Sequence, residues 1–146
     1  MLVIYDGNCN LCVTLVQFLE MLDRGQQFHY LPMQNQAGLS EFGINLKDCE
    51  AGMILLNPDQ PAQRWQGSAA AEEIGRILPG GGLFMGAYQA LPGLKGLGDR
   101  VYEQVRDFRY QWFGQRSHTY ESDYPYCAQC HPQQPASEAK SRDAQD

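Results

Sequence analysis

The sequence predicts an α/β domain whose elements run in the order β-α-β-α-β-β-α, and three observations lead to this prediction. First, the apolar run Leu2-Val3-Ile4-Tyr5 is followed by leucines at helical spacing and then by a second strand-like run, residues 28–31. Second, two strand-like runs near the middle of the chain are separated by a turn. Third, a short amphipathic helix follows this hairpin. The 146 residues are enough for one domain with its own core.

The first part of the chain is typical of a β-α-β unit. Leu11, Leu15, Leu19 and Leu22 fall on one face of the predicted helix, and a glycine ends it. A right-handed crossover then places the flanking strands parallel in one sheet. Residues 36–42 predict a short helix, which is followed by an irregular link.

The middle of the chain predicts a hairpin and a helix. Residues 52–56 predict a buried strand, residues 57–61 a turn and residues 63–66 the returning strand. Ser68 is the predicted N-cap of the following helix, which the run Pro79-Gly80-Gly81-Gly82 must end.

The remainder of the domain is predicted to be helical. Residues 83–91 form a compact apolar stretch, which we interpret as a helix covering the sheet or the functional site. Farther on, apolar residues recur at steps of four, four, three and four, which predicts an amphipathic helix ending near Gly114. These residues are Leu97, Val101, Val105, Phe108 and Trp112. We therefore expect a domain over residues 1–115, an extension over 116–131 and a disordered tail over 132–146.

The composition, with 43% hydrophobic and 19% charged residues, is typical of a soluble globular protein. The net charge of -6 argues against nucleic acid or anionic lipid as a partner. No run approaches the ~20 apolar residues of a membrane span, and the first residues lack the pattern of an export signal. We therefore expect a cytoplasmic protein that acts on proteins or small molecules.

Cys9 and Cys12 form a C-x-x-C motif at the turn from the first strand into the first helix. Residues three apart share a helix face, and the positive end of the helix dipole favours a thiolate. We expect Cys9, exposed at the helix start, to attack a disulfide as a thiolate and Cys12 to resolve the mixed disulfide. Half of a metal site and two inert core cysteines are the alternatives.

A β-α-β unit with this motif at its first turn, followed by a hairpin and a helix, is similar to the thioredoxin fold. The run Tyr5-Asp6-Gly7-Asn8-Cys9-Asn10-Leu11-Cys12 more closely resembles the DCC family of thiol-disulfide oxidoreductases, named for a D-x-x-C-x-x-C signature. Asp6, Cys9 and Cys12 occupy the three signature positions. Two further runs extend the resemblance over roughly residues 1–115: Gly67-Ser68 and Arg109-Tyr110-Gln111-Trp112-Phe113-Gly114.

The signature position gives Asp6 two open interpretations. Its carboxylate accepts the proton of the resolving thiol, or it makes the turn with Gly7 by binding backbone N–H groups. A charged carboxylate would also raise the pKa of a neighbouring thiol. Thioredoxin-like proteins usually place a cis-proline opposite the cysteine pair, where this chain has Cys49-Glu50-Ala51-Gly52-Met53. The DCC family is similar in lacking that proline.

The resemblance implies a thiol-disulfide oxidoreductase that needs no bound cofactor. Its substrates would be proteins or small molecules that contain a disulfide, and its electron donor would be glutathione or a thioredoxin-type protein. Two other classes compete with this prediction. One is a zinc-binding module that uses Cys9, Cys12, Cys127 and Cys130. The other is a protein-binding module that keeps the fold and uses residues 83–91 as its contact surface.

Other candidate residues receive simpler interpretations. Cys127 and Cys130 form a second C-x-x-C motif, for which an electron relay, a shared zinc site and a local clip all stay open. Cys49 is interpreted as a plain free thiol. Four arginines are interpreted as part of a solvated helix face with extended side chains: Arg100, Arg106, Arg109 and Arg116.

Overall fold

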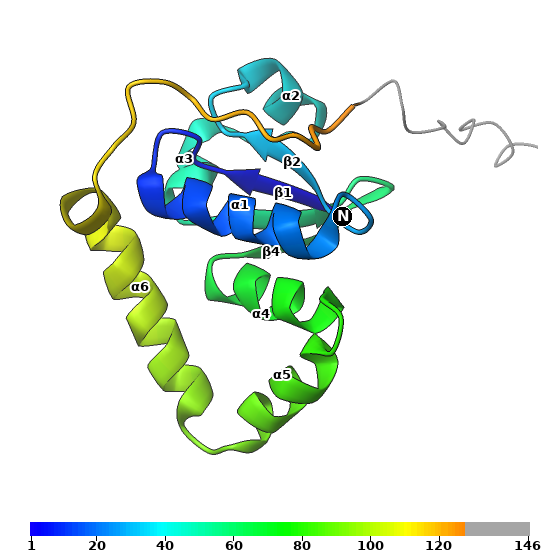
Figure 1. The fold of residues 1–146 in the computed structure, drawn as a ribbon, viewed down its shortest axis with the longest axis vertical. Helices are drawn as coiled ribbons and strands as arrows, with labels where there is room; N and C mark the ends of the chain where they lie inside the picture. Colours follow the sequence, from blue (N-terminus) through cyan, green and yellow to red (C-terminus); the bar gives the residue numbers. More distant parts are fainter. Residues whose placement is uncertain (128–146) are drawn as a thin grey trace, which may run out of the picture.

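The computed structural model describes residues 1–127, and it confirms an α/β fold. Cys130 and the predicted tail lie outside the described residues, so what the sequence predicts for them stays a prediction. Within the described part, the chain forms the strands and helices that Figure 1 draws as arrows and coiled ribbons. In order they are β1 (Leu2–Tyr5), α1 (Asn10–Asp23), β2 (His29–Pro32), α2 (Gln36–Glu41), α3 (Leu46–Glu50), β3 (Ile54–Asn57), β4 (Gln60–Gln66), α4 (Ser68–Ile77), α5 (Gly81–Ala90) and α6 (Leu94–Phe113).

The strands form one mixed sheet in the order β2-β1-β3-β4. β1 and β2 are parallel, with Val3 opposite Tyr30, so the helix between them makes the predicted crossover. β1 and β3 are antiparallel, and β3 and β4 form the predicted hairpin. This arrangement confirms the expected thioredoxin-like core. β1 is an inner strand of the sheet, with β2 on one side and β3 on the other. Its carboxyl end, which leads into the cysteine motif, therefore lies between these two strands.

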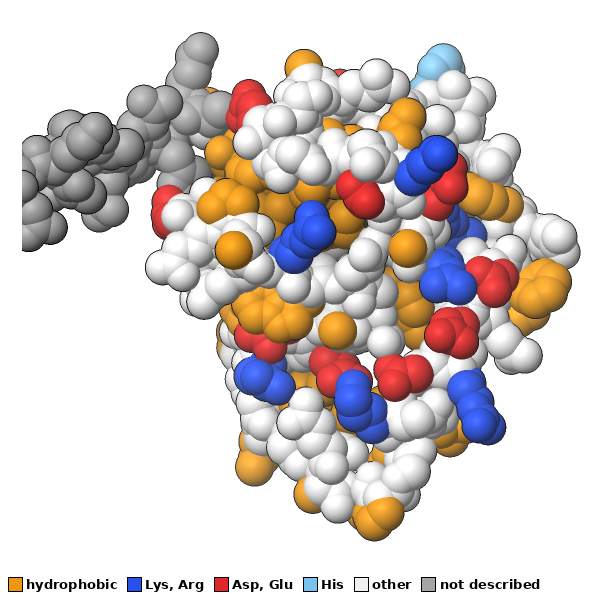
Figure 2. Space-filling model, turned by 180° about the vertical axis from the view of Figure 1, so that it is seen from behind, with side chains coloured by type: hydrophobic (Ala, Val, Ile, Leu, Met, Phe, Trp, Pro, Cys, Tyr) orange, Lys and Arg blue, Asp and Glu red, His pale blue; other side chains and the backbone are white. Residues whose placement is uncertain are grey.

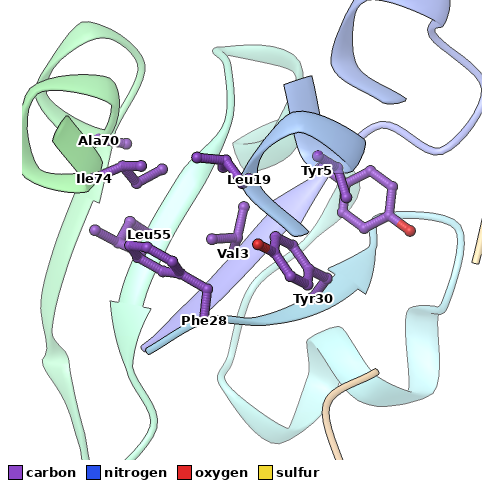
Figure 3. Close-up of a cluster of buried hydrophobic side chains, with 9 residues drawn as sticks. Val3, Tyr5, Leu19, Phe28, Tyr30, Leu55, Ala70 and Ile74 are labelled. Carbon is purple, nitrogen blue, oxygen red and sulfur yellow. The ribbon is translucent and has the colours of Figure 1, made fainter. Parts of the chain in front are cut away.

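Alternating side chains of the strands feed two hydrophobic clusters, one on each face of the sheet. Figure 3 shows the first cluster, in which Val3 and Leu55 of the sheet pack with Leu19 of α1 and Ile74 of α4. The second cluster lies on the opposite face and includes Leu39 of α2 with the following residues: Leu2, Ile4, Leu31, Ile44, Cys49, Ile54 and Leu56. Helices therefore cover both faces, and β1 is buried along its whole length.

Two local features differ from the sequence predictions. The link after α2 contains the short helix α3, which starts with a capping box made by Asn45 and Asp48. The predicted N-cap of α4 is also wrong by one residue, because Gly67 takes that position with a φ of 62° and Ser68 is the first helical residue. Glycine tolerates this positive φ, which other residues rarely adopt.

α5 and α6 form a second group of helices beside the sheet. α5 packs on α4 and α6, and α6 also packs on α1 (Figure 1). The predicted helix over residues 83–91 is thus confirmed as α5, but Leu83 and Phe84 point outward rather than covering the sheet. A salt bridge of 3.1 Å between Lys95 and Glu72 joins the start of α6 to α4.

The chain after α6 runs back across the domain and then along β2. The N–H of Tyr30 donates to Tyr124 O at 3.1 Å, and the N–H of Tyr126 donates to Tyr30 O at 3.0 Å. Figure 2 shows acidic and basic side chains interspersed over the rear face, with exposed hydrophobic side chains at its lower end, where α5 and the start of α6 lie. Among the described residues, no helix is long and apolar enough to cross a membrane.

Candidate active site

The two thiols of the C-x-x-C motif meet at the first turn of α1. Cys9 is the N-cap residue, and α1 begins at Asn10. The Sγ atom of Cys9 accepts a hydrogen bond from the backbone N–H of Cys12 at 3.4 Å. The sulfur thus takes the place that a serine or aspartate oxygen usually has at a helix N-terminus. The strand, turn and helix therefore bring the sulfur of Cys9 to the positive end of the helix dipole, as the sequence predicts.

The exposure of the two thiols is the reverse of the expectation. Cys9 is fully buried, at 0% exposure, whereas Cys12 is half-buried. The prediction that Cys9 is the exposed thiol is therefore wrong. Cys9 is buried because it pairs with Gln115 in an isolated antiparallel bridge, and these two residues are more than a hundred positions apart in the sequence.

Residues 114–120, which we call the covering segment, close over the turn that carries Cys9. A side chain at Gly7 would collide with this segment, because its Cβ atom would lie 2.6 Å from the Thr119 side chain. Glycine therefore permits the close approach. Backbone hydrogen bonds hold the segment in place, from Arg116 N–H to Asn8 O at 2.7 Å and from Tyr120 N–H to Gly7 O at 2.9 Å.

The cysteine pair holds one stabilised thiolate and one thiol. The pKa of Cys9 is lowered to about 6, chiefly by the hydrogen bond from the Cys12 thiol and further by the Cys12 N–H and the Arg109 cation. Burial and the charge of Asp6 oppose this shift. The pKa of Cys12 is raised, because it shares its proton with Cys9, is buried, and lies beside the Cys9 charge. Near neutral pH, Cys9 is therefore the thiolate and Cys12 the proton donor.

Asp6 is buried and anchors the loop between β1 and α1. Its Oδ1 atom accepts hydrogen bonds from the N–H of Asn8 and from the side chain of Gln34, both at 2.9 Å. Its Oδ2 atom accepts a hydrogen bond from the hydroxyl of Tyr110. These contacts are those expected of a residue that makes the turn. They also bring Asp6 close enough to raise the pKa of both thiols.

Arg109 is the site residue that the sequence analysis interpreted incorrectly. It is 9% exposed rather than solvated, and its Nη2 atom lies 3.6 Å from Asp6 Oδ2. Its guanidinium also lies 4.8 Å from the ring centre of Tyr110. Arg109 and Tyr110 begin the run that resembles the DCC family, and this was the signal that could have identified them. Two other residues of the site, Gln34 and Tyr102, lie in no run of the sequence that resembles the family, so no such signal could have identified them.

A cavity of about 270 Å³ opens beside Cys12. It lies between α1, α4 and α6, and the loop before β3 forms part of its wall. Its lining is almost entirely apolar, and Cys9 is not part of it. Its lining includes the following residues that matter for the site: Asp6, Leu11, Cys12, Leu15, Cys49, Val105 and Arg109. Cys49 is a free, buried thiol, and burial raises its pKa to about 11.

The loop before β3, which lines the cavity with Cys12, is hydrogen-bonded to a side chain of α6. The N–H of Met53 donates a hydrogen bond to the hydroxyl of Tyr102 at 3.3 Å. Gly52, at a φ of 127°, leaves room for that hydroxyl, since a Cβ atom there would lie 2.8 Å from it. The backbone of this loop therefore binds the protein's own helix.

Residues 1–127 contain no group of three or more His, Cys, Asp or Glu side chains placed to hold a metal ion. The second C-x-x-C motif ends at Cys130, outside the described residues. The four-cysteine zinc site and the relay and clip roles therefore stay predictions.

Comparisons with known proteins identify the family of the chain. The DCC1-like thiol-disulfide oxidoreductase family matches residues 3–115. The chain is also 27% identical over 117 residues to an uncharacterized protein, YuxK, of Bacillus subtilis (strain 168), with 78% of this chain and 81% of YuxK aligned. No solved structure matches the chain. Since the family match spans most of the sequence and includes both cysteines, the chain belongs to the DCC1-like thiol-disulfide oxidoreductase family.

Proposed function

We propose that the protein exchanges disulfides through Cys9 and Cys12, with Cys9 as the nucleophile, Cys12 as the resolving thiol and Asp6 as a positioning residue. The observation that supports this most strongly is a thiolate and a thiol held together on the first turn of a helix. A Cys9 pKa of about 6 leaves the nucleophile ionised at neutral pH, and the thiolate is the reactive form.

In the proposed reaction, the Cys9 thiolate attacks one sulfur of a substrate disulfide. A Cys9–substrate disulfide forms and the second substrate sulfur leaves as a thiolate, which takes the proton of Cys12. Cys12 then attacks the Cys9 sulfur and releases the rest of the substrate as a second thiolate. The substrate gains two electrons and the pair becomes a disulfide. Glutathione or a thioredoxin-type dithiol reduces the pair again.

The burial of Cys9 supports a second assignment of the same chemistry. Cys12 lines the cavity, whereas Cys9 lies under the covering segment. If the proton passes from Cys12 to Cys9, Cys12 becomes the attacking thiolate and Cys9 the resolving thiol. In the first assignment, the covering segment must move before attack.

Trapping separates these assignments. The variants Cys9→Ser and Cys12→Ser are each incubated with glutathione disulfide, and the adducts are located by peptide mass spectrometry. We expect a stable adduct on Cys9 in Cys12→Ser, because the resolving thiol is missing, and none in Cys9→Ser. If an adduct forms on Cys12 in Cys9→Ser and no adduct forms on Cys9 in Cys12→Ser, then Cys12 is the nucleophile and Cys9 the resolving thiol. The absence of an adduct in both variants would contradict the proposed function.

Three further parts of the proposal concern the whole protein. Residues 1–115 form the catalytic domain, and residues 116–131 form an extension that includes most of the covering segment and the second C-x-x-C motif. The protein acts in the cytoplasm, where reducing thiols are available to return electrons to the pair. Its substrates are disulfides of proteins or small molecules.

A further inference from the structure

The apolar face of α6 is left largely uncovered. The residues whose spacing predicts an amphipathic helix lie on this face, but four of them are 41–58% exposed: Leu97, Val101, Phe108 and Trp112. The fifth, Val105, is half-buried and lines the cavity beside Cys12. An amphipathic helix normally buries such a stripe.

A second uncovered stripe lies on α1. Leu15, Phe18 and Leu22 are 40%, 51% and 49% exposed, and Leu11 precedes them by one turn on the same face. Leu11 and Leu15 line the same cavity as Val105.

The two stripes share this cavity and diverge from it. α1 starts at the cysteine pair and runs away from it, whereas α6 ends beside the pair, since the side chain of Asn10 donates to Phe113 O at 2.8 Å. Figure 1 shows the two helices close together at these ends and apart at the others, with α4 between them. The exposed apolar surface is therefore continuous with the wall that contains Cys12.

We propose that this cleft between α1, α4 and α6 binds an extended, apolar segment of a polypeptide substrate and presents its disulfide to the cysteine pair. This inference rests on the proposed function, because the thiols at one end of the cleft determine that the occupant carries a disulfide. The stripe from Leu11 to Leu22 spans about 16 Å at the rise of an α-helix, which equals about five residues of extended chain. A small, charged thiol such as glutathione would leave most of this surface uncovered.

Recognition in the cleft depends on side chains. The backbone N–H of Met53, in the loop that lines the cavity with Cys12, already binds Tyr102. A substrate therefore gains little from strand-like pairing at this loop, and its affinity comes from apolar side chains placed along the cleft.

Peptide binding to the full chain tests the proposal. The protein carries Cys9→Ser and Cys12→Ser, so that binding is measured without exchange. The probe is a short synthetic peptide with Leu, Val and Phe around one alkylated cysteine, and its control is a peptide of the same length and charge with Ser and Gln instead. We expect only the apolar peptide to bind. Adding Leu15→Gln or Val105→Gln weakens binding by about tenfold, because each removes an aliphatic side chain that lines the cavity and that the peptide would cover.

Leu83→Gln provides the matched control, since Leu83 is 87% exposed on α5 and does not line the cavity. It leaves peptide binding unchanged, and thermal unfolding shows that each variant is folded. Equal binding of the two peptides, or an equal loss in Leu83→Gln, would overturn the proposal. The proposal would also be overturned if the peptide does not bind, while a second copy of the chain or neutral phospholipid vesicles bind and Leu15→Gln abolishes that binding. If the peptide fails to bind but glutathione still forms an adduct with Cys12→Ser, the docking inference is wrong and the exchange function stands.

Discussion

Arg109 is a buried cation held beside the thiols from the far end of the domain. Arg109 lowers the pKa of Cys9. The carboxylate of Asp6, with which Arg109 forms an ion pair, raises the pKa of Cys9. Arg109→Gln removes the positive charge and leaves the carboxylate, so the pKa of Cys9 rises by about one unit or more. Titration of the thiolate absorbance in the reduced protein measures this shift. Arg100→Gln, an exposed position on the same helix, is the control and leaves the midpoint near 6.

Asp6 has the opposite electrostatic effect and a larger structural one. Asp6→Ala leaves Arg109 buried without its carboxylate and removes acceptors from Asn8 and Gln34. We expect a loss of about 3 kcal/mol in the free energy of unfolding, measured by urea denaturation under reducing conditions. Asp6→Asn keeps the Oδ1 acceptor of Asn8 and Gln34 and loses only the Oδ2 acceptor of Tyr110, so it destabilises less than Asp6→Ala. It also lowers the pKa of Cys9, because a negative charge is gone. If Asp6→Ala has the same free energy of unfolding as the unmodified protein, this account is wrong.

The covering segment is the element that decides access to Cys9. Arg116→Pro removes the N–H that donates to Asn8 O, whereas Arg116→Ala keeps it and loses only the side chain. One such hydrogen bond contributes about 0.5–1.5 kcal/mol, so Arg116→Pro should speed alkylation of Cys9 by about two- to tenfold over Arg116→Ala. The rates are measured in a Cys12→Ser background by peptide mass spectrometry. Equal rates in the two variants would mean that this bond does not limit access.

Local elements were predictable where local signals are strong. β1, the cysteine turn and α1 follow from an apolar run, a C-x-x-C motif and leucines at helical spacing. α3 was missed because it has five residues, too few for a periodic pattern, and its capping box uses Asn45 and Asp48 in place of the usual pair. The sequence also did not predict the direction of α6 or the exposure of its apolar stripe. The spacing of the apolar residues predicts an apolar face, but it does not predict what packs on that face.

At the scale of the whole molecule, long-range contacts account for what sequence reasoning missed in the site. The burial of Cys9 depends on Gln115, and that of Arg109 depends on Asp6, and no local pattern links such distant positions. The cysteine pair itself was predictable because both thiols lie within one turn of helix. The division of the chain at residue 115 and the role of the second C-x-x-C motif stay predictions.

The stability of the reduced protein should depend on pH through Cys9. Its pKa falls from 9.0 to about 6 on folding, so the folded state binds fewer protons between these values. The thiolate therefore stabilises the fold fully above pH 9, and this contribution is lost as the pH falls through 6. Relative to Cys9→Ser, the free energy of unfolding should rise between pH 6 and 9 by up to about 1.4 kcal/mol per pH unit.

Chemical denaturation across this range, with a reductant present, measures the slope. Cys49→Ser is the control, because burial raises the pKa of Cys49 to about 11 and its titration adds little slope below about pH 8. A Cys9→Ser variant with the same slope as the unmodified chain would show that the Cys9 thiolate does not stabilise the fold.

The pairing of Tyr30 with residues 124 and 126 has a consequence for the protein at high concentration. A strand at the border of a sheet offers unpaired backbone groups to other chains, which is a common route to aggregation. Here the returning chain occupies the border at β2. At the opposite border, β4 contains Pro61, which has no N–H to offer, and the charged Arg64. The sheet is therefore guarded against intermolecular β-pairing on both sides, and a chain shortened before Tyr124 would lose that protection on one of them.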